Sequence, residues 1–181
     1  MLDQGADVSA QGGFYGDALR AASEMGGGRI VKLLLDQGAD ISTRGRLCCN
    51  ALQAASVTGD EQSVKLLLDA GADVNAQGGE YGNALQAALV GGEEQTVRLL
   101  LDRGADVNAE GGEYGNALQA ASAEGHKQIV KLLLDYGAEI NAQGGQYGSA
   151  LQVALAKGQE EVVELLASKG AVAFEKRTET L

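Results

Sequence analysis

Few side chains in this sequence carry the chemistry of a catalytic site. The only histidine is His126, and the only two cysteines, Cys48 and Cys49, are adjacent in the chain. Adjacent cysteines fit neither the spacing of a metal site nor a disulfide framework, and no motif that pairs a nucleophile with a histidine surrounds His126. The double glycines are not followed by the Lys-Ser or Lys-Thr of a phosphate-binding loop. These residues predict a protein that is not an enzyme and that holds no metal or cofactor.

Carboxylates are the other side chains with possible chemistry, among them Glu80, Glu110 and Glu113. Paired carboxylates do acid–base work where burial or close approach shifts their pKa values. Glu80 and Glu113 lie one repeat apart, which predicts solvated surface groups rather than a catalytic pair. Small-molecule binding or catalysis in a groove is a third alternative, and a closed pocket among these residues would favour it.

These carboxylates belong to a 33-residue repeat that organises the chain. The stretch 76–88 reads Ala-Gln-Gly-Gly-Glu-Tyr-Gly-Asn-Ala-Leu-Gln-Ala-Ala, and near-copies of it recur on both sides. Its leucine recurs at one fixed interval, at Leu19, Leu52, Leu85, Leu118 and Leu151. A period of this length without insertions indicates a stack of supersecondary units, none of which can bury its apolar face alone.

The composition fits a stack of small helices and limits the kind of partner. The chain has 181 residues, of which 45% are hydrophobic but only 4% aromatic, so Ala, Leu and Val must build the core. With 25 acidic and 14 basic residues the formal net charge is −11, which disfavours binding to nucleic acid or to an anionic membrane surface. No leader-like N-terminus and no membrane-spanning apolar run is present, so we expect a cytoplasmic protein, with the nucleus left open.

The sequence of each unit predicts a first helix that begins at a polar N-cap residue. Asn83 is a good N-cap, and the helix formers at 84–89 end before Gly92, where a positive φ can stop the helix. The equivalent cap positions in the other units are Asp17, Asn50, Asn116 and Ser149.

A second helix and a tight turn complete the unit. In Gln-Ser-Val-Lys-Leu-Leu-Leu-Asp, Val64, Leu67 and Leu68 fall at i, i+3 and i+4 and form an apolar stripe. An extended stretch then leads to Gly78 and Gly79, which permit the positive-φ turn of a hairpin.

The repeat predicts one domain of consecutive units. Residues 1–11 align with the end of a unit whose first helix is missing, and from this we expect a piece of a larger protein. Five full units follow, at about 12–44, 45–77, 78–110, 111–143 and 144–173, and 174–181 form a polar tail.

The second half of each unit resembles the ankyrin repeat. Residues 97–109 read Val-Arg-Leu-Leu-Leu-Asp-Arg-Gly-Ala-Asp-Val-Asn-Ala, which nearly reproduces the pattern of that family. In the first half Asn83, Ala84 and Gln86 replace the Thr, Pro and His of Thr-Pro-Leu-His-x-Ala, and a glutamine amide can still donate and accept hydrogen bonds between units. The resemblance covers residues 1–173 and implies an all-α solenoid of helix-turn-helix units with projecting β-hairpin-like turns.

The turn sequence resembles a particular branch of that family. Gly-Gly-x-Tyr-Gly-Asn-Ala-Leu-Gln-Ala-Ala is similar to the long ankyrin arrays of filamentous fungi, including those of NOD-like (NACHT-type) receptors. His126 follows a glycine at the start of a second helix, where the family often has histidine, which favours a structural role for it. The resemblance implies a non-catalytic protein-binding module, the recognition part of a larger fungal sensor or scaffold.

If the chain follows the family, it binds a protein on a concave surface of hairpin tips and first helices. Residues in those columns vary between units while the framework does not, as expected of a surface adapted to a partner; drift on an unused surface is the alternative. The candidate contact residues are Phe14, Arg46, Leu47, Glu80, Glu113 and Gln146 at the tips, and Met25, Val57, Leu89, Val90 and Leu155 on the first helices.

A column of tyrosines allows two interpretations. Its members are Tyr15, Tyr81, Tyr114 and Tyr147, with Cys48 in the place of the missing one. Aromatic side chains are favoured anchors in interfaces, so the ladder could grip a partner. The regular recurrence of these tyrosines favours a structural role instead, in which each ring packs at the base of its tip against the next unit with the hydroxyl outward.

Self-association is the alternative to binding another protein. Terminal repeats need a polar outer face, which Glu160, Glu161 and Glu164 partly supply at the C-terminal end. The N-terminal end has no such device, and we expect exposed apolar surface around Leu19 and Leu33. Such a surface predicts a two-fold homodimer.

Overall fold

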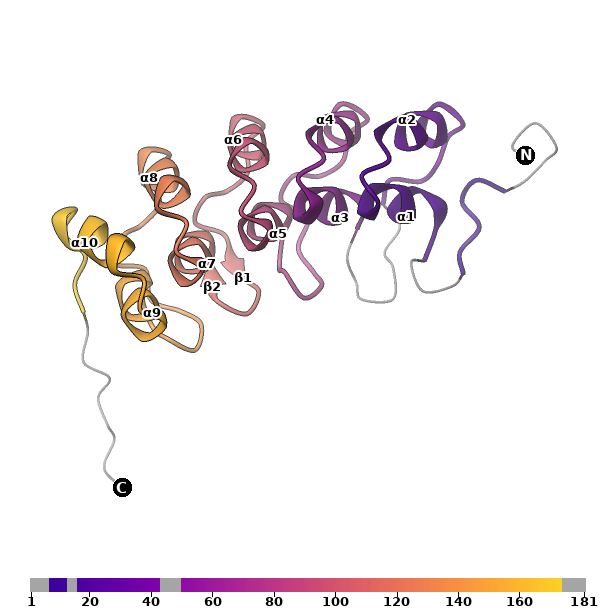
Figure 1. Ribbon diagram of the computed structural model, residues 1–181. Coiled ribbons are helices and arrows are strands. Elements are labelled where there is room, and N and C mark those ends of the chain that lie inside the picture. The colour runs from indigo at the N-terminus through magenta and orange to yellow at the C-terminus, as the bar shows by residue number, and fades with distance from the viewer. Residues whose placement is uncertain (1–6, 13–15, 43–49, 174–181) are drawn as a thin grey trace, which may run out of the picture.

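The computed structural model describes residues 7–12, 16–42 and 50–173, in which ten short α-helices form a curved row (Figure 1). The first helices of the units are α1 (Ala18–Glu24), α3 (Ala51–Thr58), α5 (Ala84–Gly91), α7 (Ala117–Glu124) and α9 (Ala150–Lys157). The second helices are α2 (Gly28–Asp36), α4 (Glu61–Asp69), α6 (Glu94–Asp102), α8 (Lys127–Asp135) and α10 (Glu160–Ser168). The second helices line the outer side of the row, and the hairpins project beyond the first helices on the inner side. The predicted all-α solenoid is confirmed.

Each first helix begins at the polar cap that the sequence predicts. The Asn83 side chain accepts a hydrogen bond from the backbone amide of Gln86 at 2.8 Å. Helix α5 ends at Gly92, whose φ of 72° lies in the left-handed region that favours glycine. The same N-cap bond is made by Asp17, Asn50, Asn116 and Ser149. Capping satisfies amides that a helix leaves free at its start.

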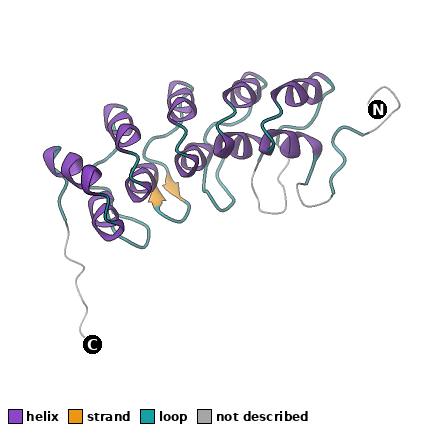
Figure 2. Ribbon diagram, viewed as in Figure 1, coloured by secondary structure: helices purple, strands orange, loops and turns teal. Residues whose placement is uncertain are grey.

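The turns before the first helices are narrow hairpins that contact one another. Strand β1 (Glu110–Gly111) pairs antiparallel with β2 (Gly115–Asn116) (Figure 2), and isolated bridges join Gly12 to Gly16, Gly78 to Gly82 and Gly144 to Gly148. Gly112 has a φ of 64°, and a Cβ there would lie 2.6 Å from the carbonyl oxygen of Tyr81 in the preceding hairpin. Neighbouring hairpins therefore meet backbone to backbone, and glycine is required for that approach.

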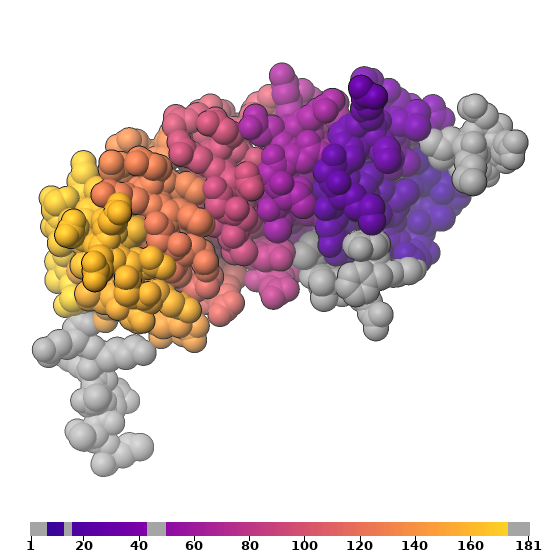
Figure 3. All heavy atoms as spheres, viewed as in Figure 1, coloured from indigo at the N-terminus to yellow at the C-terminus, as the bar shows by residue number. Residues whose placement is uncertain are grey.

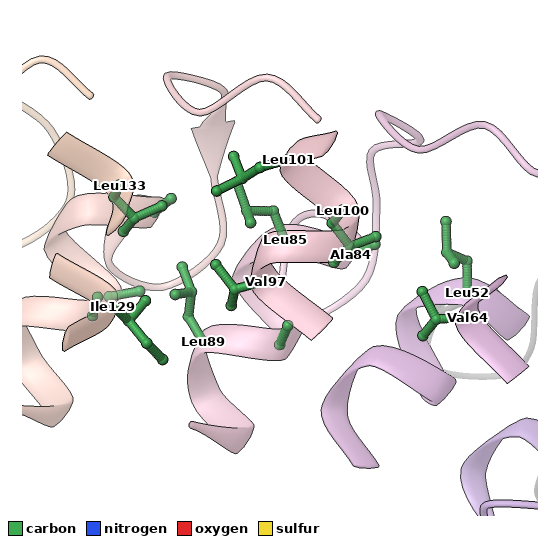
Figure 4. Close-up of a cluster of buried hydrophobic side chains, with 14 of the residues drawn as sticks. Leu52, Val64, Ala84, Leu85, Leu89, Val97, Leu100, Leu101, Ile129 and Leu133 are labelled. Atoms are coloured by element: carbon green, nitrogen blue, oxygen red, sulfur yellow. The ribbon is translucent and has the colours of Figure 1, made fainter. Parts of the chain in front are cut away.

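Adjacent units share a single apolar core between the two rows of helices. Leu85 and Val97, from the two helices of one unit, are buried in it. The predicted stripe is present in the unit before, where Val64 and Leu67 are fully buried and Leu68 is half-buried. Figure 4 shows side chains of three successive units in this cluster, among them Leu52, Leu85, Leu89, Val97, Ile129 and Leu133. No helix pair encloses this core alone.

Buried glutamines tie three of the first helices, α3, α5 and α7, to the hairpin of the following unit. Gln86 Nε2 donates to the carbonyl oxygen of Gly111 at 2.8 Å. Equivalent bonds run from Gln53 to Gly78 and Gly82 at 3.0 and 3.2 Å, and from Gln119 to Gly148 at 2.8 Å. The predicted donation by this glutamine column across units is confirmed. The carbonyl oxygens of Gly82 and Gly148 also accept a backbone amide of their own hairpin, so each of them accepts two hydrogen bonds.

A second set of hydrogen bonds between units was not predicted from the sequence. Asn75 Nδ2 donates to the carbonyl oxygen of Gly104 at 3.1 Å, and Asn75 Oδ1 accepts from the amide of Asp106 at 2.8 Å. Asn108 repeats both bonds one unit later, with Gly137 and Glu139. The loops after the second helices are therefore also linked from one unit to the next.

The N-terminal end of the described stack differs in part from expectation. Leu19 is buried because it belongs to the shared apolar cluster, so its predicted exposure is wrong. Leu33 is 51% exposed, as expected, and Ile30 beside it on α2 is 55% exposed. In the later units the residues equivalent to Ile30 are buried, namely Ser63, Thr96, Ile129 and Val162. Helix α2 thus presents to solvent a face that the stack covers elsewhere.

Candidate partner-binding face

The inner side of the row carries the predicted contact residues at the hairpins. Glu80, Glu113 and Gln146 are exposed there, one unit apart from each other. In the space-filling view the units form one continuous elongated surface (Figure 3). The predicted residues Phe14, Arg46 and Leu47 lie outside the described residues, as do Tyr15, Cys48 and Cys49.

The predicted contact residues on the first helices divide by exposure. Met25, Val90 and Leu155 are exposed, with 71%, 43% and 54% of their surface open to solvent, and Val57 is half-buried. Large apolar side chains at these exposures are available for contact with a partner.

Leu89 is not on the surface, and its assignment to the contact face is wrong. It is fully buried, and so are Ser23, Ser56 and Ser122 in the same column. This column faces the neighbouring unit, so its members are covered wherever another unit follows. Leu155 belongs to the same column and is exposed because it lies in the last helix pair of the described stack.

Three members of the tyrosine column lie in the described hairpins. Tyr81, Tyr114 and Tyr147 are each half-buried. The Tyr114 hydroxyl donates to Glu124 Oε1 at 2.9 Å, at the end of its own unit's first helix. In the following unit the ammonium of Lys157 lies 5.7 Å from the centre of the Tyr147 ring. The rings therefore serve both packing and charge contacts.

A partly open hollow lies on the inner side between the third and fourth units. It has a volume of about 220 Å³ and is bounded by both hairpins and by α5 and α7. Its walls include Tyr81, Gln86, Val90 and Tyr114, and three carboxylates, those of Glu80, Glu113 and Glu124. The hollow brings together three predicted contact residues, Glu80, Val90 and Glu113, with two rings of the tyrosine column. It is not the closed pocket that would favour catalysis.

Sequence reasoning did not select Glu124 as a site residue. It occupies a column that reads Met25, Thr58, Gly91, Glu124 and Lys157, so no repeated residue type marked it. Its position ten residues after Tyr114 was the available signal, because that spacing joins a hairpin to the end of the next helix.

A smaller hollow of about 80 Å³ lies between the first three units. Glu24, Val57, Glu80 and Tyr81 line it. Arg20, which stands in the glutamine column, is buried at its base and forms an ion pair with Glu24 at 3.7 Å. The negative charge of Glu24 is thus partly balanced within the chain.

Within the described ranges no group of three or more His, Cys, Asp or Glu side chains is placed to hold a metal ion. His126 lies against the preceding unit, where a Cβ on Gly92 would come within 2.9 Å of its imidazole ring. This contact gives His126 a packing role. None of the described helices has the length and apolar character needed to cross a bilayer.

The hydrogen bond to Glu124 raises the pKa of Tyr114 to about 12, with burial and the negative charge nearby acting in the same direction. Because the pKa of Tyr114 is raised in the folded state, the contact stabilises the fold fully below the ordinary tyrosine pKa of 10.0, and this stabilisation is lost as the pH rises toward 12.

We expect Glu124→Gln to lower the pKa of Tyr114, measured from tyrosinate absorbance during alkaline titration. Glu164→Gln, far from the ring, should leave the titration unchanged. Identical curves for Glu124→Gln and the native chain would contradict the assignment.

Comparison with known proteins identifies the repeat. A family model described as ankyrin repeats (3 copies) matches residues 1–78, 18–111 and 86–177. No curated protein gives a significant match. Since the matched ranges cover nearly all of the chain and the helix pairs stack as the repeat predicts, the chain belongs to the ankyrin repeat family.

Proposed function

We propose that this chain is a non-catalytic module that binds another protein on the inner face of its hairpins and first helices. Ankyrin repeats are general protein–protein interaction modules, and the family is typically non-catalytic. The observation that supports this face is that it carries exposed carboxylates outside any ion pair of the described residues. Glu80 and Glu113 are exposed at the hairpins and form no ion pair among the described residues.

The outer face differs because several of its charges are paired between units. Arg103 contacts Asp69 at 2.9 Å, and Lys127 contacts Glu161 at 3.0 Å. Such pairs occupy charges that a partner would otherwise contact. The inner face instead combines open carboxylates with exposed apolar groups such as Val90, a composition suited to a docking surface.

The wider setting of the module is also part of the proposal. The Gly-Gly-x-Tyr-Gly-Asn-Ala-Leu-Gln-Ala-Ala variant resembles fungal arrays, which supports a recognition part of a larger fungal sensor or scaffold of the NOD-like type. A cytoplasmic location, with the nucleus as the other compartment, fits this role.

Partner capture tests the inner face directly. The double variant Glu80→Lys, Glu113→Lys should reduce capture of the native partner from a cell extract about tenfold or more, since it reverses two charges at the contact. Asp135→Lys, Glu164→Lys makes the same change of charge on exposed second-helix positions and should retain capture. Equal loss in both double variants, or loss only in the outer one, would contradict the proposed face.

Self-association is the second candidate function, and Ile30 and Leu33 on α2 favour it because both are more than half exposed. If this face pairs with its copy in a second chain, the native protein should sediment as a dimer at micromolar concentrations. Ile30→Glu, Leu33→Glu should sediment as a monomer, because a charge would be buried at the contact. A native chain that sediments as a monomer at these concentrations rules this function out.

A further inference from the structure

We infer that the hollow between the third and fourth units binds a basic side chain of the partner, with arginine preferred over lysine. This inference rests on the proposed function, because the side chain is presented by a protein docked on the inner face. It adds the chemistry of the contact and places it among Tyr81, Gln86, Glu113 and Tyr114.

The hollow is negative and aromatic at once. The carboxylates of Glu80, Glu113 and Glu124 lie in its walls together with the rings of Tyr81 and Tyr114, and none of its lining residues is basic. Carboxylates attract a cation, and the face of an aromatic ring attracts it as well. An exposed acidic cluster alone is ordinary surface, but two further features of the same hollow point to a ligand.

The first feature is a buried acceptor in the wall. Gln86 is 4% exposed, and its Oε1 has no hydrogen-bond partner among the described residues, although its Nε2 is bonded to Gly111. In the second unit the same oxygen of Gln53 accepts from the Asn50 amide at 3.0 Å. A buried carbonyl without a donor is costly, and an incoming N–H donor would satisfy it. Gln119 Oε1 is also without a partner but does not line this hollow.

The second feature is that the chain itself places a cation at the equivalent ring. Lys157, at the end of α9, lies over Tyr147. One unit earlier the equivalent residue is Glu124, and its carboxylate is held by the Tyr114 hydroxyl. Two units earlier it is Gly91. Because none of the residues that line the hollow is basic, a cation in it comes from a partner.

The size of the hollow and the placement of its acceptors favour arginine over lysine. The hollow is about 220 Å³, and its acceptors come both from the hairpins, with Glu80 and Glu113, and from α5 and α7, with Gln86 and Glu124. A planar guanidinium stacks on an aromatic ring while its several N–H groups donate outward, whereas the lysine ammonium is a compact point charge. The net charge of −11 also speeds the approach of a basic segment.

Short peptides test this inference on the full chain. The probe is acetyl-Gly-Arg-Gly-amide, and its control is the same peptide with citrulline, which keeps the shape of arginine without its charge. In a titration followed by NMR, the arginine peptide should shift resonances of Tyr81, Gln86 and Tyr114. The citrulline peptide should bind at least about tenfold more weakly, and the lysine peptide should fall between them.

Variants locate the binding. Glu113→Gln keeps the shape of the hollow and removes one charge, so it should weaken arginine-peptide binding about threefold or more. Glu164→Gln removes the same charge from α10 and should have no effect. Absence of binding, equal binding of the citrulline peptide, or shifts confined to other units would overturn the inference.

The peptide titration and the capture experiment distinguish failure of the arginine inference from failure of the proposed function. If Glu80→Lys, Glu113→Lys abolishes partner capture while no peptide binds the hollow, the proposed function stands and the arginine inference fails. If the arginine peptide binds the hollow while capture is unaffected by the charge reversal, the hollow binds basic side chains but the proposed docking face is wrong.

Discussion

The interface between adjacent units is the interaction on which the rest of this structure depends. The helices are seven to nine residues long, below the roughly 12 to 15 residues that an isolated helix needs in water. They persist because neighbouring units bury leucines such as Leu85 in a common core and exchange hydrogen bonds through Gln86 and Asn75. Apolar burial supplies most of the free energy, while the polar bonds fix how one unit sits on the next.

This division of roles explains why the inner face can vary. The hairpins are held through backbone groups, since Gln86 donates to the Gly111 carbonyl and Gly112 approaches the Tyr81 carbonyl. Neither contact involves the side chain at the tip. Positions such as Glu80 and Glu113 can therefore change from unit to unit without loss of the fold, and a partner can select their chemistry. The negative and aromatic hollow between the third and fourth units is one result of that freedom.

Much of the architecture could be predicted from the repeat because each signal was local. Asn83 as a cap, Gly92 as a helix stop and the apolar stripe through Val64 act within one unit, and the sequence alone defines them. What was missed lies between units. Leu89 occupies a helix position that is covered only by the next unit, and the bonds of Asn75 cross to the following loop. Such contacts depend on the angle at which units stack, which the spacing of residues along one chain does not give. The candidate site was predicted less well than the fold for the same reason, because Glu124 joins Glu80 in the hollow only after two units pack together.

The central claim, that neighbouring units stabilise one another, is tested most directly by one leucine substitution made at two places. Leu85 lies within the stack and Leu151 in the last described helix pair, and both are buried. Chemical unfolding should show that Leu85→Ala lowers the free energy of unfolding by about 2 to 5 kcal/mol, and that Leu151→Ala, with a unit on one side only, lowers it by clearly less. Equal losses at the two positions would mean that each helix pair holds its own core, which contradicts mutual stabilisation between units.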